Sequence, residues 1–342
     1  MNQTARASWL AAAVVAALLL PLALSDYKLR VMVLALISAI AVIGLVVAFG
    51  WAGLIQLGQA AFIGLGAYTS AILAQRFGLS FWITMPLALV LAALVALLIA
   101  RPMLRLRGHY LALAALVALL MARPMLRLRG HYLALATVGL NVTAEIVAKN
   151  WIAMTGGYDG ISGIPGLALF GREIEGDLAW YYVALACVLI VAALTGWLRQ
   201  SHIGRAMIAV RDDEIAAGTS SVAVVRTKVL AFVIASVLAA LSGALYAHYA
   251  KYIAPQDFDL ARSVAILVML IAGGEMSIVG AIVGAVLLSF LPEWLRFAGD
   301  AYLAVFGVGV LLLLILLPDG IAGRFNKWLR RLYKRAPAAS HG

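Results

Sequence analysis

The chain has 342 residues, of which 65% are hydrophobic and only 12% are charged, and its formal net charge is +11. Soluble domains have about 45–50% apolar and about 25% charged residues, so this composition excludes a soluble protein and predicts an all-α polytopic membrane protein. At about 20 apolar residues per crossing there is room for roughly eight to eleven helices. Lys and Arg lie in short loops and in the tail, and no soluble basic face remains to hold nucleic acid. The single cysteine, Cys187, excludes an intrachain disulfide.

Ten hydrophobic runs predict about ten transmembrane helices. The first run lacks an evident cleavage site and is interpreted as a retained helix rather than as a signal peptide. Several runs are shorter than about 20 residues, so they need tilt or burial inside the bundle, and the eighth run gives the weakest signal. The predicted spans are 9–24, 31–49, 59–73, 81–100, 131–148, 180–198, 229–249, 263–271, 278–291 and 302–317.

Loop charges give an independent orientation. The region 101–107 and the tail at 324–342 are basic, whereas the loop at 151–177 holds more acidic than basic residues. Because cytoplasmic loops carry the excess of Lys and Arg, both termini are predicted to be cytoplasmic, which requires an even number of crossings. The chain then divides into a transmembrane domain at 1–323 and a basic cytoplasmic tail at 324–342.

One segment of the chain is present twice. Residues 93–114 recur as residues 115–136 with only Ile99 replaced by Met121, at a period of 22 residues. Such near-identity is too high for an ancient structural repeat and indicates a recent duplication, within 93–136, or an assembly artefact. Its apolar part, residues 110–122, is shorter than the about 20 residues of an ordinary span. We predict that it is interfacial or re-entrant and leaves the topology unchanged.

Glycines cluster near the predicted spans at 59–73 and 278–291. Helices in lipid gain stability by close backbone approach, so the spacing Gly280-x-x-x-Gly284 predicts a packing face. Packing is preferred over substrate contact for the whole set, and Glu275, beside two of these glycines, is interpreted as a loop or helix-end residue. The set comprises Gly50, Gly53, Gly58, Gly64, Gly66, Gly273, Gly274, Gly280 and Gly284.

The loop at 199–228 is a long polar interruption that also carries strong helix formers. Arg and Lys side chains surround the acidic residues Asp212, Asp213 and Glu214, and alanines and isoleucines supply an apolar side. This pattern predicts a short amphipathic helix at the cytoplasmic membrane surface.

No enzyme motif occurs in the chain. It lacks the phosphate loop G-x-x-x-x-G-K-[ST] and the zinc motif H-E-x-x-H, and its five histidines have no metal-ligand spacing. We therefore expect no catalytic residue, no cofactor and no metal site. Any energy from ATP must then arrive through a partner protein.

Three polar residues in the span at 131–148, namely Asn141, Thr143 and Glu145, form a candidate translocation path. A carboxylate inside a membrane is costly unless it faces the bundle interior or water. The alternative is that Glu145 lies near Lys149 at the outer interface, where its charge is solvated, and the residues leave both interpretations open.

A glycine-rich segment at 154–166 lies on the predicted outer side. Its Tyr158 and Asp159 are candidate contacts for an extracytoplasmic binding protein, and an ordinary ordered turn is the alternative interpretation.

Six segments, by their order and spacing, resemble the LivM-type permeases of branched-chain amino acid ABC importers, and the resemblance covers about residues 31–321. It implies a multi-pass protein of the bacterial inner membrane that lies in the lipid bilayer. It also implies cytoplasmic ATP-binding subunits, a second homologous permease and a periplasmic substrate-binding protein as partners. The segments are GWAGLIQLGQAAFIGLGAYTSAIL (50–73), LRLRGHYLALAT (126–137), TGGYDGISGIP (155–165), GRAMIAVRDDEIAA (204–217), KVLAFVIASVLAALSGALYAHY (228–249) and AGGEMSIVGAIVGA (272–285).

The resemblance implies that residues 204–217 are the coupling loop that docks into the ATP-binding subunit. Charges would fix the register of docking, and alanines would allow close approach. A solvated loop that only obeys the orientation rule is the alternative. The implied docking residues are Gly204, Arg205, Arg211, Asp212, Asp213, Glu214, Ala216 and Ala217.

The chain departs from the family pattern in two places. Gly218-Thr219-Ser220-Ser221 follows Ala217, so Ser221 stands where the family usually has glycine, and the helix is expected to end early. The Arg-Leu-Arg-Gly segment, present once in the family, occurs twice here.

The expected function is that of a permease subunit, not an enzyme, which moves branched-chain amino acids into the cell by alternating access driven by a separate ATPase subunit. A permease for urea or short-chain amides is the closest alternative. An ion-coupled secondary transporter, with Glu145 as its ion site, is the alternative from another class. A non-transporting scaffold is the least favoured.

Overall fold

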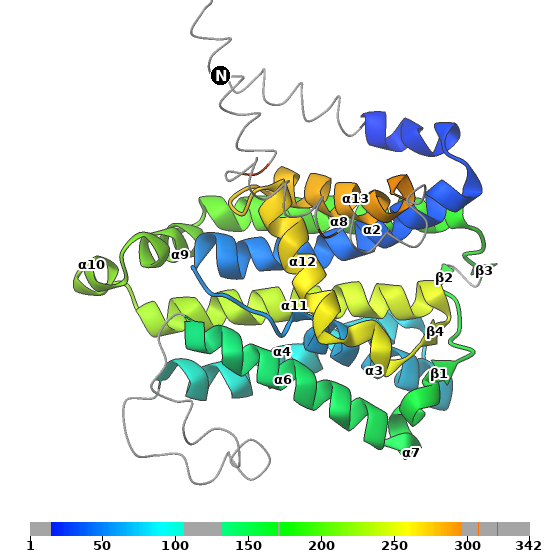
Figure 1. Ribbon diagram of the computed structural model, residues 1–342, viewed down its shortest axis with the longest axis horizontal. Helices are drawn as coiled ribbons and strands as arrows, with labels where there is room; N and C mark the ends of the chain where they lie inside the picture. The colour runs from blue at the N-terminus through cyan, green and yellow to red at the C-terminus, as the bar shows by residue number, and fades with distance from the viewer. Residues whose placement is uncertain (1–14, 106–130, 170–171, 296–306, 308–319, 321–342) are drawn as a thin grey trace, which may run out of the picture.

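The computed structural model describes residues 15–105, 131–169, 172–295, 307 and 320. Helices dominate this part of the chain, as expected (Figure 1). The longer helices are α2 (Asp26–Leu45), α3 (Gln59–Phe77), α4 (Phe81–Arg105), α6 (His131–Asn150), α8 (Asp177–Gln200), α9 (His202–Asp212), α11 (Val224–Ala250), α12 (Leu260–Gly273) and α13 (Ile278–Trp294). The short ones are η1 (Leu20–Ala23), the π-helix η2 (Val46–Trp51), α7 (Ile152–Thr155), η3 (Gly157–Asp159), α10 (Glu214–Thr219) and η4 (Pro255–Phe258).

Two short antiparallel strand pairs add to the helices that were expected. In the first, β1 (Ile161–Ser162) pairs with β4 (Tyr252–Ile253), with Ile161 opposite Ile253. In the second, β2 (Ala168–Leu169) pairs with β3 (Arg172–Glu173). The pair β1–β4 ties the segment after α6 to the segment after α11, so distant parts of the chain are joined at one end of the bundle.

Four described helical segments are long and apolar enough to cross a membrane: Asp26–Trp51, Phe81–Ala100, Asp177–Gln200 and Val224–Ala250. Each coincides with a predicted span. Helices also occupy the predicted spans at 59–73, 131–148, 263–271 and 278–291. The number of ten crossings and the side of each terminus stay predictions.

Several predictions concern residues outside the described part. The first span is described only from residue 15, and the run at 302–317 only at residue 307. The segment at 110–122 and the tail at 324–342 lie outside the described residues.

The two ends of the bundle are distinct. At one end, named here the ladder end, Arg30 at the start of α2 forms an ion pair of 2.8 Å with Asp177 at the start of α8. The hydroxyl of Tyr249, near the end of α11, donates to the same carboxylate at 3.0 Å. The opposite end, named the loop end, carries α9 and α10 (Figure 1).

Helices α3 and α12 begin in the interior of the bundle instead of at an end. The side-chain amide of Gln59, the first residue of α3, donates to the backbone oxygens of Ala41 and Ala235. Ala235 lies near the middle of α11, and Ala41 lies one turn before the end of α2, where the π-helix η2 continues it. The N–H of Ala60 then donates to Ser263 Oγ in the first turn of α12 at 2.8 Å. Neither α3 nor α12 is therefore a simple crossing from one end to the other.

Close packing at glycine confirms the packing interpretation in both clusters. A Cβ at Gly66 of α3 would lie 2.1 Å from the backbone oxygen of Ala240 in α11. A Cβ at Gly284 of α13 would lie 2.1 Å from the backbone oxygen of Met269 in α12. Only glycine allows these helix backbones to approach so closely.

Candidate functional site

The polar loop at the loop end folds into two helices instead of the single one predicted. Ser201 caps α9, because its Oγ accepts a hydrogen bond from the N–H of Gly204 at 3.3 Å. Asp213 is extended and separates the helices, and its Oδ1 accepts from the N–H groups of Ile215 and Ala216 at 2.8 and 3.0 Å. Such a cap satisfies the first free N–H groups of a helix. Besides its predicted place in the docking set, Asp213 therefore ends α9 and caps α10.

The eight predicted docking residues fall into two groups. Gly204 and Ala217 are buried and Arg211 is half-buried, so these three face the bundle. Ile215 is also exposed, with 78% of its surface accessible. The docking set predicted from the sequence does not include it. The sequence signal that could have identified Ile215 was its position directly after Asp212, Asp213 and Glu214. The exposed group comprises Arg205, Asp212, Asp213, Glu214 and Ala216.

Arg211 joins three segments of the bundle. Its guanidinium donates to the backbone oxygen of Gly50 in η2 and to the carboxylate of Glu275. Glu275 lies in the turn between α12 and α13, which confirms its interpretation as a loop residue. A Cβ at Gly50 would lie 2.0 Å from the backbone oxygen of Glu275, so the three residues are tightly packed. We name Gly50, Arg211 and Glu275 the loop-end junction.

Ser221 has the backbone conformation that glycine prefers. Its φ is 66°, in the left-handed region, directly after α10 has ended at Thr219. Glycine adopts this region without the steric penalty of a Cβ. The conformation thus gives a physical reason for the glycine that the resemblance implies at this position.

The three predicted path residues on α6 face different surroundings. Asn141 is fully buried, and its amide nitrogen lies 3.5 Å from the backbone oxygen of Phe258. Thr143 is exposed and donates to the backbone oxygen of Gly139 at 2.8 Å. Glu145 forms an ion pair of 2.6 Å with Lys149, one turn later on α6. The pair compensates the charge of Glu145 within α6, and both interpretations of Glu145 stay predictions.

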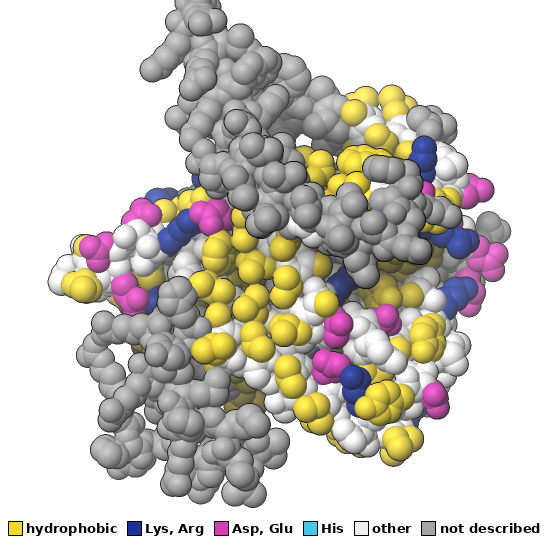
Figure 2. Space-filling model, in the orientation of Figure 1, with side chains coloured by type: hydrophobic (Ala, Val, Ile, Leu, Met, Phe, Trp, Pro, Cys, Tyr) yellow, Lys and Arg dark blue, Asp and Glu magenta, His cyan; other side chains and the backbone are white. Residues whose placement is uncertain are grey.

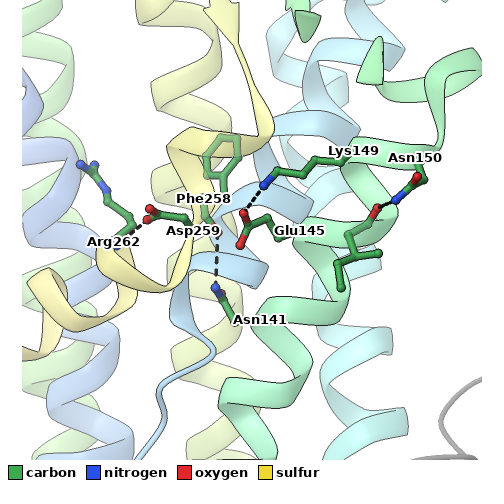
Figure 3. Close-up of polar contacts among 8 residues, drawn as sticks. Asn141, Glu145, Lys149, Asn150, Phe258, Asp259 and Arg262 are labelled. Atoms are coloured by element: carbon green, nitrogen blue, oxygen red, sulfur yellow. Dashed lines mark hydrogen bonds and ion pairs between the residues drawn. The ribbon is translucent and has the colours of Figure 1, made fainter. Parts of the chain in front are cut away.

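The start of α12 lies beside these residues, and sequence reasoning did not single it out. Asp259 caps α12, because its Oδ1 accepts from the N–H of Arg262 at 2.9 Å. Figure 3 shows Asp259 between Glu145 and Arg262, whose guanidinium points away from both carboxylates. The signal that could have identified this group was an arginine at the edge of an otherwise apolar run. We name Asn141, Asp259, Arg262 and Ser263, together with Gln59, the central site.

Charged side chains gather in the middle of one largely hydrophobic face of the bundle (Figure 2). Helices α12 and α6 also carry exposed apolar residues, among them Val264 and Ile146. A cluster of charges is costly against lipid unless it faces water or another protein. This face is therefore better suited to a polar path or a partner than to lipid alone.

The predicted outer contact residues are exposed at the ladder end. Tyr158 is 65% exposed, and its ring lies 5.6 Å from the amine of Lys149. The backbone oxygen of Asp159 accepts from the hydroxyl of Tyr252 in β4 at 3.1 Å. The segment is an ordered turn, as one interpretation stated, and it also presents an aromatic side chain to the surroundings.

Comparisons with known proteins give one family and three related permeases. The model of the family described as "Branched-chain amino acid transport system / permease component" matches residues 27–114 and 110–317. The high-affinity branched-chain amino acid transport system permease protein LivM of Escherichia coli is 31% identical over 92% of this chain and 74% of its own length. LivM of Salmonella typhimurium is 30% identical over the same shares.

A more distant relative is the ribose import permease protein RbsC of Bacillus subtilis. It is 27% identical over 45% of this chain and 49% of its own length. No solved structure matches the chain. The two segments matched by the family model overlap at residues 110–114, inside the duplicated segment.

Proposed function

Because the chain belongs to the family of branched-chain amino acid transport permeases, we propose that it is the membrane subunit of an ATP-driven importer of branched-chain amino acids. The observation that carries the proposal is the family match along both halves of the chain. The four long apolar helices agree with a membrane position. We keep 1–323 as the transmembrane domain and 324–342 as a cytoplasmic tail within this proposal.

In this proposal the loop end faces the cytoplasm and α9 and α10 dock on an ATP-binding subunit. Exposed Asp212 and Glu214 would steer docking, and Ile215 would enter an apolar pocket of the ATPase. Exposed apolar residues at the centre of charged surfaces are typical anchors of an interface. Lys228, which forms an ion pair of 2.6 Å with Glu214, holds α10 against the start of α11.

The loop-end junction would carry the movement of the docked loop into the bundle. Arg211 forms hydrogen bonds with the turn between α12 and α13, through Glu275, and with the end of η2, through Gly50. A displacement of α9 therefore acts on α12 without an intervening flexible segment. Coupling of this kind requires contacts that differ between two states of the protein, and the Arg211–Glu275 ion pair is the contact that we assign to this role.

We assign the two other exposed regions to the remaining partners. The ladder end, with Tyr158 exposed, would receive the substrate-binding protein. The face that carries α6 and α12 would lie against the second permease, with the polar path between the two subunits. The first part of that path is formed by Asn141, Thr143 and Glu145.

Reconstitution in lipid vesicles tests the proposal. The chain, a second permease, the ATPase subunits and a leucine-loaded binding protein should give leucine uptake that stops when ATP is omitted. Uptake that continues on a proton gradient without ATP would overturn the proposal in favour of an ion-coupled transporter. ATP-dependent uptake of urea or acetamide without uptake of leucine would identify the amide importer instead.

A further inference from the structure

The starts of α3 and α12 meet at a depth where a transported molecule would need protein contacts. Arg262 of α12 donates to Ser38 Oγ of α2 at 3.2 Å. At about 1.5 Å per residue, Ser38 lies about 18 Å along α2 from its start, roughly half-way through an apolar core of about 30 Å. Helices that begin at such a depth direct their positive ends into the bundle.

Four buried side-chain atoms have no hydrogen-bond partner among the described residues, and two of them belong to α3. These two are Oε1 of Gln59 and the hydroxyl of Tyr68. Gln59 is 0% exposed, and Tyr68 is 8% exposed with its ring 5.8 Å from that of Phe258. Buried polar atoms are satisfied in nearly all native structures. Both atoms can accept a hydrogen bond. Oε1 of Gln59, which belongs to the central site, is therefore available to a donor from outside the chain.

Arg262 and Gln59 reach the same face of α2. Gln59 donates to the oxygen of Ala41, one turn beyond the Ser38 side chain that Arg262 contacts. The guanidinium also lies 6.0 Å from the ring centre of Tyr246. None of the ion pairs among the described residues includes Arg262. Asp257 and Asp259 interact electrostatically with Arg262 without forming an ion pair with it, so the guanidinium of this half-buried residue can still take an anion from outside the chain.

We propose that the central site binds the backbone of an α-amino acid during transport. Arg262 takes the carboxylate through paired N–H donors. The ammonium group donates to Oε1 of Gln59, and the carboxylate of Asp259 supplies negative charge beside it. The amino-acid backbone, which carries both charges, matches this set. The proposal rests on the function proposed above and names the residues of this chain that contact the substrate.

Substitution of Arg262 in the reconstituted importer tests the site. Leucine uptake and ATP hydrolysis are measured with saturating leucine-loaded binding protein. Arg262→Gln should lower uptake by about tenfold or more, because a charge-assisted contact is lost, while stimulation of the ATPase by the binding protein persists. Arg262→Lys, which keeps the charge, should retain more uptake than Arg262→Gln.

Arg226→Gln is the matched control, since Arg226, in the first turn of α11, is exposed and lies outside both the docking residues at 204–217 and the central site. It should leave uptake near the wild-type level. Uptake by Arg262→Gln within twofold of wild type would overturn the inference. An equal fall of uptake and ATPase activity, with no benefit from Arg262→Lys, would also overturn it, because that pattern marks a structural role.

A labelling experiment keeps the inference testable if Arg262→Gln does not assemble. In a Cys187→Ser background, the thiol of Arg262→Cys is exposed to a membrane-impermeant methanethiosulfonate reagent. Labelling that slows when leucine-loaded binding protein and ATP are present supports the site, and absence of labelling overturns it. A wild-type complex without ATP-dependent leucine uptake would instead overturn the proposed function itself.

Discussion

Two arginines lie near opposite ends of α12, and their surroundings differ in one respect. Arg211 reaches the turn after α12 and meets the carboxylate of Glu275. Arg262, in the first turn of α12, meets a hydroxyl and an aromatic ring, and no carboxylate forms an ion pair with it in the part of the chain that the structure describes. A paired charge holds parts of one protein together, whereas an unpaired charge is available to a ligand. We call the Arg211–Glu275 pair the closed contact and the surroundings of Arg262 the open contact. Helix α12 connects the two.

The largest effect should come from breaking the closed contact sterically. A Cβ at Gly50 would lie 2.0 Å from the backbone oxygen of Glu275, and backbone cannot move aside as a flexible side chain can. Gly50→Ala should lower the free energy of unfolding by about 1–3 kcal/mol and abolish leucine uptake. Thermal unfolding in detergent and vesicle uptake measure the two effects.

Gly139→Ala is the matched control for this prediction. A Cβ at Gly139 meets no atom within 4 Å, so the protein should fold and transport normally. Equal stability of the two variants would show that the loop-end junction is not tightly packed.

A charge exchange across the closed contact should have the next largest effect. Arg211→Glu and Glu275→Arg should each separate ATP hydrolysis from uptake, since either change places like charges together. Stability should change by only about 1 kcal/mol or less, because the two side chains are 25% and 40% exposed. The double exchange restores opposite charges and should recover part of the uptake. If the double variant is no better than the singles, the ion pair does not carry the coupling.

A smaller effect is expected near the open contact, at the ion pair on α6. Glu145→Gln removes the pair with Lys149, which has partly exposed partners one helical turn apart. Pairs of this kind stabilise a helix by about 0.3–0.5 kcal/mol, so the free energy of unfolding should fall by about this amount, and uptake should stay dependent on ATP. Adding Lys149→Gln should cause little further loss. Complete loss of uptake in Glu145→Gln would favour an ion-coupled mechanism.

The smallest effect should be a gain in stability from a substitution that lies away from both contacts. Ser221 has a φ of 66° and is exposed after α10. Ser221→Gly should raise the free energy of unfolding by about 0.5–1 kcal/mol, since it relieves a left-handed conformation that disfavours a Cβ. Uptake and ATP hydrolysis should be unchanged. Ser220→Gly, at a negative φ of −86°, is the control and should not stabilise the protein.

The sequence by itself determined the membrane class, the position of most helices and the family. These properties depend on local runs of apolar residues and on the order of short motifs, which are visible without any long-range contact. It also located the polar loop and the glycines at which helices pack. The prediction of a single loop helix was wrong, because the capping of α10 by Asp213 depends on an extended backbone at that residue.

Only the tertiary structure decided which charges are paired. Arg211 is 64 positions from Glu275, and Arg262 is 224 positions from Ser38. The interior starts of α3 and α12 likewise rest on a bond between Ala60 and Ser263, 203 positions apart. Such contacts leave no periodic pattern in a sequence, so the direction in which Arg211 points and the lack of a described carboxylate partner for Arg262 follow only from how the helices pack.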